Sequence, residues 1–174
     1  MSTVGLMTRN VRKLALVAHV VTSVGWIGAI AAFLVLALGG LNSQDAALVR
    51  ASYAAMEVIA WWILLPLAVA SLVTGLIMSF GTKWGLLRHY WVVTKLVLTL
   101  IAVGVLLVKM KPISELGGLA RQGPLGVDHV GQDGLSLVLH AVGGILILLA
   151  NTSLAFYKPA GMTRYGRRKE TKQT

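Results

Sequence analysis

The chain has 174 residues, of which 56% are hydrophobic and 13% are charged, with a formal net charge of +10. Soluble domains carry roughly 25% charged residues, so this composition excludes an ordinary soluble domain and points to lipid as the solvent. The chain contains no cysteine, which excludes disulfides, thiolate nucleophiles and cysteine-ligated metal or iron–sulfur sites.

The first predicted element is an apolar run over residues 13–38, preceded by a short cytoplasmic segment over 1–12. The run is too long for the apolar region of a signal peptide, and no small-residue cleavage pattern follows it. We therefore expect a retained first membrane span.

Three further spans are predicted at about 57–80, 90–108 and 134–157. Each is long enough to cross a hydrocarbon core of about 30 Å at about 1.5 Å per residue. Pro66 lies inside the second span and predicts a kink, because membrane helices tolerate proline. The expected fold is all-α, a four-helix transmembrane bundle over residues 13–157.

The connecting segments are expected to lie outside the spans. Residues 39–53 are predicted to carry a short surface helix that begins after Asn42 or Ser43, which are good N-caps. The glycine-rich segment 109–133 is predicted to be irregular, with one short helix near residues 113–121. The basic tail, 158–174, is predicted to lie on the membrane surface or to be disordered.

Basic residues are distributed unequally between the two ends of the predicted bundle. Cytoplasmic segments are enriched in lysine and arginine, so both termini are predicted to be cytoplasmic. Eleven of the 16 basic residues lie on the predicted cytoplasmic side, and the opposite side holds Arg50, Lys109, Lys111 and Arg121. The same asymmetry predicts contact between the cytoplasmic face and anionic lipid. A nucleic-acid partner is not expected, because the tail lacks the aromatic residues and motifs of such proteins.

Small residues recur at helical spacing in the spans, for example in Gly25-x-x-x-Ala29 and Ser71-x-x-x-Gly75. Such stripes allow close helix packing in lipid. They fit packing within one bundle, a homo-oligomer or contact with another membrane protein, and these readings stay open.

Polar side chains at membrane depth are the candidate functional groups, because they are costly in lipid and usually face the bundle interior. From the predicted cytoplasmic ends, His19, Lys95 and Asn151 lie about 8–9 Å deep at about 1.5 Å per residue. Thr94 lies beside Lys95. These four residues predict one polar inner layer. The alternatives are that Lys95 extends its amine to the headgroups and that a hydrogen bond to Asn151 or a threonine satisfies His19.

Histidine and methionine are the available soft metal ligands. His19 and His140 are about 16 Å apart in depth at about 1.5 Å per residue, so they cannot ligate the same haem iron. His19 with His89, a haem with one protein ligand, or two haems remain open. Glu57, Met56 and His140 form a candidate copper site near the outer face. Glu57 is alternatively an ordinary charge at a helix N-terminus.

The segment Ala18–Ala29, with His19, Trp26 and Gly28 in the order H-x6-W-x-G, resembles the first span of CopD-like copper-resistance domains and HemJ-type protoporphyrinogen oxidases. The overall plan resembles an uncharacterised family of four-span bacterial membrane proteins, in which a segment similar to Trp84–Lys95 opens the third span. The HemJ-type resemblance implies that His19 ligates haem b in a bacterial plasma membrane. The CopD-like resemblance implies copper passage, but the chain lacks a methionine- or histidine-rich series that would carry copper.

Three function classes follow. The first is a haem b protein for electron transfer or porphyrin chemistry, and the second is a metal-handling protein or small-solute permease. The third is an accessory subunit that binds another membrane protein. No nucleotide-binding, zinc-protease or serine-hydrolase motif is present, so the sequence assigns no enzymatic reaction.

Overall fold

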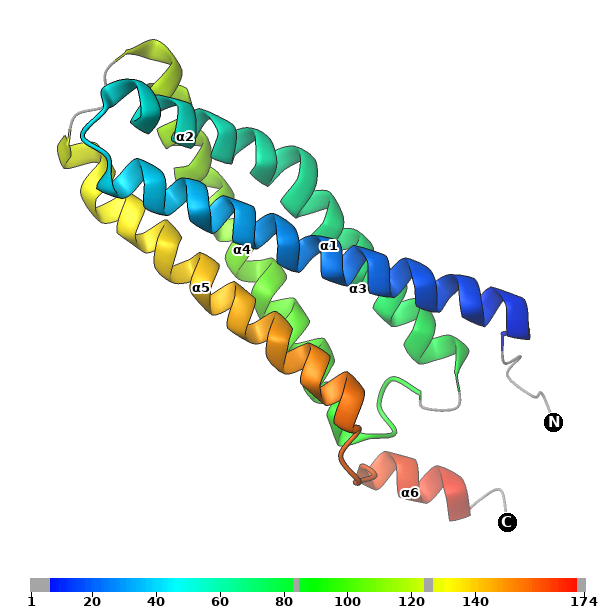
Figure 1. The fold of residues 1–174 in the computed structure, drawn as a ribbon. Helices are drawn as coiled ribbons and strands as arrows, with labels where there is room; N and C mark the ends of the chain where they lie inside the picture. Colours follow the sequence, from blue (N-terminus) through cyan, green and yellow to red (C-terminus); the bar gives the residue numbers. More distant parts are fainter. Residues whose placement is uncertain (1–6, 83–84, 124–126, 172–174) are drawn as a thin grey trace.

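A computed structural model describes residues 7–82, 85–123 and 127–171 of the chain. Lys83, Trp84 and Lys172, on which the orientation and resemblance arguments partly rest, lie outside the described residues. The elements, shown in Figure 1, are α1 (Arg9–Asn42), α2 (Ala46–Ile59), the π-helical turn η1 (Ala60–Leu64), α3 (Leu65–Gly81), α4 (Tyr90–Gln122), α5 (Val127–Tyr157) and α6 (Arg164–Thr171).

Four helical segments among the described residues are long and apolar enough to cross a membrane. They are Arg9–Asn42, Ala46–Gly81, Tyr90–Gln122 and Val130–Tyr157. Many of their apolar side chains point outward, as shown by Val35, Trp62 and Leu139, which are 69%, 78% and 61% exposed. Apolar side chains on the outside of long helices are typical of contact with lipid. The prediction of an all-α chain with four long apolar helices is confirmed.

The helices form a ring in which α1 packs against α2, α3 and α5, and α4 packs against α2 and α5. Contacts between α3 and α4 are much sparser. Figure 1 shows α1 and α3 diverging from α4 and α5 toward the end of the bundle that carries both termini. The bundle is therefore closed at one end and splayed at the other.

The packed core lies at the end away from the termini. Trp26, Tyr53 and Met56 are each 1% exposed, and every buried residue of α1 lies from Trp26 onward. A Cβ atom at Gly134 would lie 2.6 Å from the Tyr53 hydroxyl, so glycine on α5 leaves room for the end of the Tyr53 side chain. The close packing ends about halfway along α1.

The helices extend beyond the predicted spans, and this corrects two expectations for the connecting segments. The predicted surface helix in residues 39–53 is the first part of the second long helix, and its cap is Asp45, which accepts a hydrogen bond from the Ala47 amide at 2.8 Å. The predicted loop after residue 108 is helical to Gln122. Ile113, Leu116 and Ala120 on this extension are buried, so packing stabilises the helix despite Pro112.

Pro66 lies immediately after a π-helical turn in a helix that continues without a break. The amide of Leu65 donates to the carbonyl of Ala60, five residues earlier. A π turn contains one extra residue and often accompanies a bend or a functional position. The contacts differ on the two sides of the turn: α2 packs on both α1 and α4, whereas α3 packs mainly on α1.

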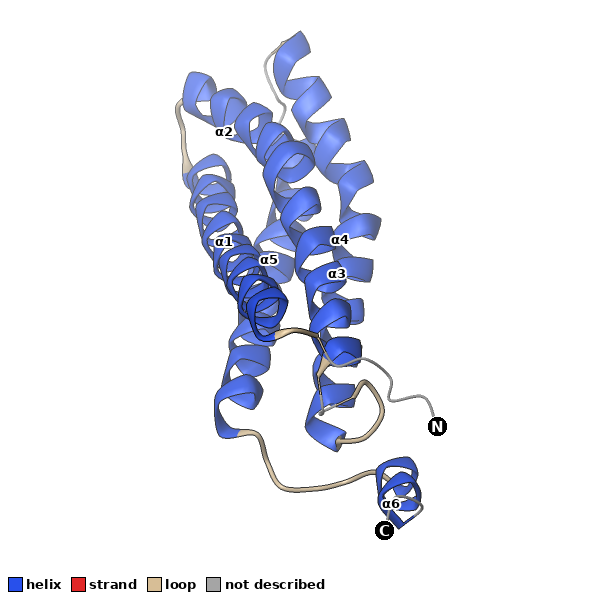
Figure 2. Cartoon of the chain, turned by 90° about the vertical axis from the view of Figure 1, so that its right-hand side faces the viewer, coloured by secondary structure: helices blue, strands red, loops and turns tan. Residues whose placement is uncertain are grey.

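The basic tail is attached to the connection between α3 and α4. α5 ends where Lys158 adopts a positive φ of 42°, and the amide of Thr163 donates to the Arg88 carbonyl at 3.0 Å. α6 follows and lies outside the end of the bundle (Figure 2). The expected disorder of the tail is therefore wrong for Arg164–Thr171.

Candidate functional site

The splayed end of the bundle contains a cavity of about 710 Å³ between α1, α3, α4 and α5. His19, Lys95 and Asn151 line this cavity together. Thr94 is exposed and is not among the lining residues, whereas Thr99, just over one turn later, is. Depth along a helix could be read from the sequence, but the rotation of each helix could not.

The first wall of the cavity joins α1 to α3 through His19. Its Nδ1 lies 3.0 Å from the Thr74 hydroxyl, and that hydroxyl donates its only hydrogen to the Ala70 carbonyl at 2.7 Å. While the Thr74 hydroxyl donates to Ala70, it can only accept from His19, and the hydrogen of this bond then lies on Nδ1. In this tautomer the neutral ring carries its free lone pair on Nε2. The expected hydrogen bond between His19 and a threonine exists, and it engages the Nδ1 side of the ring.

Gly75 gives the His19 ring its space on this wall. A Cβ atom at residue 75 would lie 3.2 Å from Cε1 of the ring, closer than comfortable van der Waals contact. One turn further into the bundle, the hydroxyls of Ser23 and Ser71 are 2.9 Å apart. The imidazole is thus held against α3 by the hydrogen bond to Thr74 and by close packing at Gly75.

The second wall joins α4 to α5 through Asn151. Its amide nitrogen donates to the Thr99 hydroxyl at 3.0 Å, and Thr99 donates to the Lys95 carbonyl at 2.9 Å. While Thr99 donates to the Lys95 carbonyl, its hydroxyl can only accept from Asn151, and this assigns the amide nitrogen to the Thr99 side. Asn151 is 8% exposed and its Oδ1 is buried with no hydrogen-bond partner in the described structure. Such an acceptor is costly unless a ligand or water donates to it.

Positive charge surrounds the cavity. Lys95 lines its interior, and its ammonium lies 6.0 Å from the centroid of the Trp91 ring. Arg12, Lys13 and Lys158 also line the cavity and are exposed. Leu16, Val20, Leu72, Leu76, Leu96 and Leu148 supply much of the apolar lining. The site therefore suits a ligand that combines an apolar body with acidic groups.

The other predicted histidine sites lie elsewhere. His89 is the N-cap of α4, pairs with Met162 in an isolated bridge and has its ring centroid 6.4 Å from that of Trp91. His140 on α5 lies in a separate groove beside Lys109. Neither residue is among those that line the cavity with His19.

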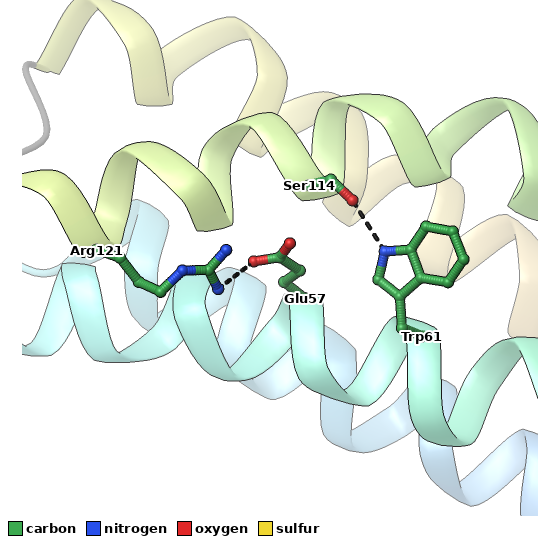
Figure 3. Close-up of polar contacts among 4 residues, drawn as sticks. All are labelled: Glu57, Trp61, Ser114 and Arg121. Atoms are coloured by element: carbon green, nitrogen blue, oxygen red, sulfur yellow. Dashed lines mark hydrogen bonds and ion pairs between the residues drawn. The ribbon is translucent and has the colours of Figure 1, made fainter.

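The candidate outer metal ligands are engaged in packing between helices. Figure 3 shows Glu57 on α2 paired with Arg121 on α4, one turn from a hydrogen bond of 2.9 Å between Trp61 and Ser114. Met56 is 1% exposed, inside the core. Within the part of the chain that the structure describes, no three His, Asp or Glu side chains gather as a metal-binding group.

Sequence reasoning missed the residues that orient the site. Thr74 and Thr99 each donate to their own helix and accept from a neighbouring helix. The sequence shows where the two threonines lie along their helices. Their hydrogen-bond partners depend on which helices pack together, which the sequence does not show. No protein-family model, curated protein or solved structure matches this chain. The function is therefore argued from the chemistry of the cavity.

Proposed function

We propose that this chain is a multi-pass protein of the bacterial plasma membrane, with cytoplasmic termini, that binds haem b in the cavity through Nε2 of His19. The supporting observation is the hydrogen bond between Nδ1 of His19 and Thr74, because the tautomer in which Nδ1 donates to Thr74 has Nε2 as a potential ligand. Metal-binding histidines commonly have this arrangement, in which the second nitrogen donates to a fixed partner.

The shape and charge of the cavity also fit this group. Its volume of about 710 Å³ lies within the range of about 300–1,000 Å³ typical of ligand and cofactor sites. The apolar lining suits a porphyrin ring, and Lys95, Arg12, Lys13 and Lys158 are cations available to the two propionates. Met7 and Met78 also line the cavity, and a thioether is a known second axial ligand of haem iron.

The residues of the chain would have distinct roles. His19 would hold the iron, and Thr74 with Gly75 would orient the imidazole. The basic residues would bind the propionates, and Asn151 would present an acceptor from the opposite wall. Bound haem would supply one-electron chemistry whose potential depends on these neighbours.

The test is an absorbance spectrum of detergent-purified protein from cells supplied with haem, before and after reduction by dithionite. We expect a Soret band, with sharp α and β bands after reduction. His19→Ala should abolish them, and the matched His89→Ala and His140→Ala variants should retain them. Free imidazole added to His19→Ala should restore the bands, because it can replace the lost ligand. A featureless spectrum, or bands that survive in folded His19→Ala, would overturn the proposal.

The alternative functions have less structural support. Glu57 and Met56 are occupied by other contacts, which disfavours the copper site. The buried Trp26, Tyr53 and Met56 pack the opposite half of the bundle, so the cavity does not favour a permease. No contact among the described residues indicates a partner protein, so no structural observation favours the accessory-subunit function.

A further inference from the structure

A second polar cluster lies on the outer surface of the bundle, where α4 faces α5. Nζ of Lys109 donates to the Ser136 hydroxyl at 2.9 Å. Nδ1 of His140 lies 2.6 Å from the Ser136 carbonyl, and a carbonyl only accepts, so Nδ1 carries a hydrogen. This cluster shares no residue with the cavity that contains His19.

The cluster has hydrogen-bond donors without acceptors. A hydroxyl that accepts from an ammonium still has its own hydrogen, and the described residues supply no acceptor for the hydrogen of Ser136. The Lys109 ammonium likewise has two further N–H groups. The two ion pairs found in the described residues involve other cations, Lys111 and Arg121. No carboxylate whose side chain the structure describes therefore lies at ion-pair distance from Lys109.

An apolar groove of about 340 Å³ begins at this cluster and is lined by Ile101, Gly104, Val105, Val108, Lys109 and His140. It follows α4 for about two turns at about 3.6 residues per turn. No atom lies within 4 Å of a Cβ built on Gly104, so the groove is open there. Ile101 and Val105 are 48% and 37% exposed.

We propose that this groove binds one net-anionic phospholipid, with a phosphate oxygen accepting from Lys109 and Ser136 and an acyl chain lying over Gly104. A phosphate supplies the acceptors that the two donors lack and the charge that Lys109 lacks. The groove runs from the cation along the apolar part of α4, which matches a lipid and does not match free phosphate. A zwitterionic lipid carries its own cation and fits less well. Basic pockets between membrane helices bind anionic headgroups in this way.

The absence of cysteine allows a probe at this one site. A fluorophore on Val108→Cys, in a chain reconstituted into bilayers, would be quenched by lipid with brominated acyl chains that occupies the groove. We compare brominated phosphatidylglycerol with brominated phosphatidylcholine of the same chain length. The expected preference for phosphatidylglycerol is roughly fivefold, as for one basic residue at an anionic surface.

Substitutions then separate the headgroup contact from the groove. Lys109→Gln should reduce the preference to about one, and Lys111→Gln, whose partner is the exposed Glu115, should leave it unchanged. Gly104→Leu should weaken quenching by both lipids, because the side chain fills the groove. Equal quenching by both lipids in the unsubstituted protein would overturn the inference, as would equal effects of the two lysine substitutions. The haem spectrum is unaffected by either result, because the sites are separate.

Discussion

At residue scale, Thr74 holds Nδ1 of His19 in a hydrogen bond. When the Thr74 hydroxyl donates to the Ala70 carbonyl, the His19 proton lies between the ring and Thr74, and Nε2 is the nitrogen that a ligand can use. Valine in place of Thr74 keeps the shape and removes the acceptor. The imidazole would then be free to rotate or to change tautomer.

We expect Thr74→Val to weaken haem binding about 10- to 100-fold, as loss of such orienting partners does in metal sites. The measurement is titration of haem-free protein with haem, followed at the Soret band. Thr22→Val is the matched control, because the Thr22 hydroxyl donates only within its own helix. Equal affinities for Thr74→Val and the control would contradict the role of Thr74.

The sequence predicted candidate residues better than it predicted their partners. Helix rise placed His19, Lys95 and Asn151 at similar depth, and they line one cavity. Thr94 and Thr99 could not be distinguished in the same way, because depth does not say which way a side chain points. The close contact of Gly75 with His19 depends on the pairing of α1 with α3, which a single sequence does not contain.

At element scale, α2 and α4 are joined by Glu57 and Arg121 near the end opposite the termini. The Glu57 side chain is 15% exposed and that of Arg121 is 55% exposed. Gly117 lies directly against Glu57, with no room for a Cβ atom. The carboxylate is thus held between the helices and the guanidinium lies over it.

Removing the cation should destabilise the bundle more than neutralising the acid. Arg121→Ala leaves a mostly buried carboxylate without its partner, whereas Glu57→Gln leaves an exposed arginine. We expect a lower Tm for Arg121→Ala than for Glu57→Gln, measured by circular dichroism in detergent. Lys111→Ala, which breaks an exposed pair with Glu115, should leave the Tm nearly unchanged. The reverse order of the first two variants would contradict this account.

The helix ends were the least predictable elements. Lys109 and Lys111 follow the predicted third span, but Ile113, Leu116 and Ala120 continue an apolar face that α4 buries. The two charges indicate where the hydrocarbon would end, and they do not indicate where the helix ends. Pro66 was similarly visible, but the π turn that precedes it is a property of the folded helix.

At the scale of the whole molecule, the structure puts both termini at one end and leaves open which side of the membrane that end faces (Figure 1). The distribution of basic residues predicts the cytoplasm. Gln44, between α1 and α2, is exposed, and Leu87, between α3 and α4, is 52% exposed. These two positions report opposite ends of the bundle.

We expect a membrane-impermeant maleimide to label Gln44→Cys in intact cells and to label Leu87→Cys only after permeabilisation. The chain has no other cysteine, so each signal comes from one position. The reverse pattern would show that the termini face outward. The geometry of the His19 cavity and of the Lys109 groove would be unchanged, but each would lie toward the opposite side of the membrane.

The sparse contact between α3 and α4 affects the route by which a ligand reaches the cavity. These two helices both line the cavity, yet their packing does little to close it on that side. We therefore expect an apolar ligand to enter the cavity sideways from the surrounding leaflet, without passing through water. The concentration that governs occupancy is then the amount dissolved in the bilayer, so a compound nearly insoluble in the cytosol can still saturate the protein.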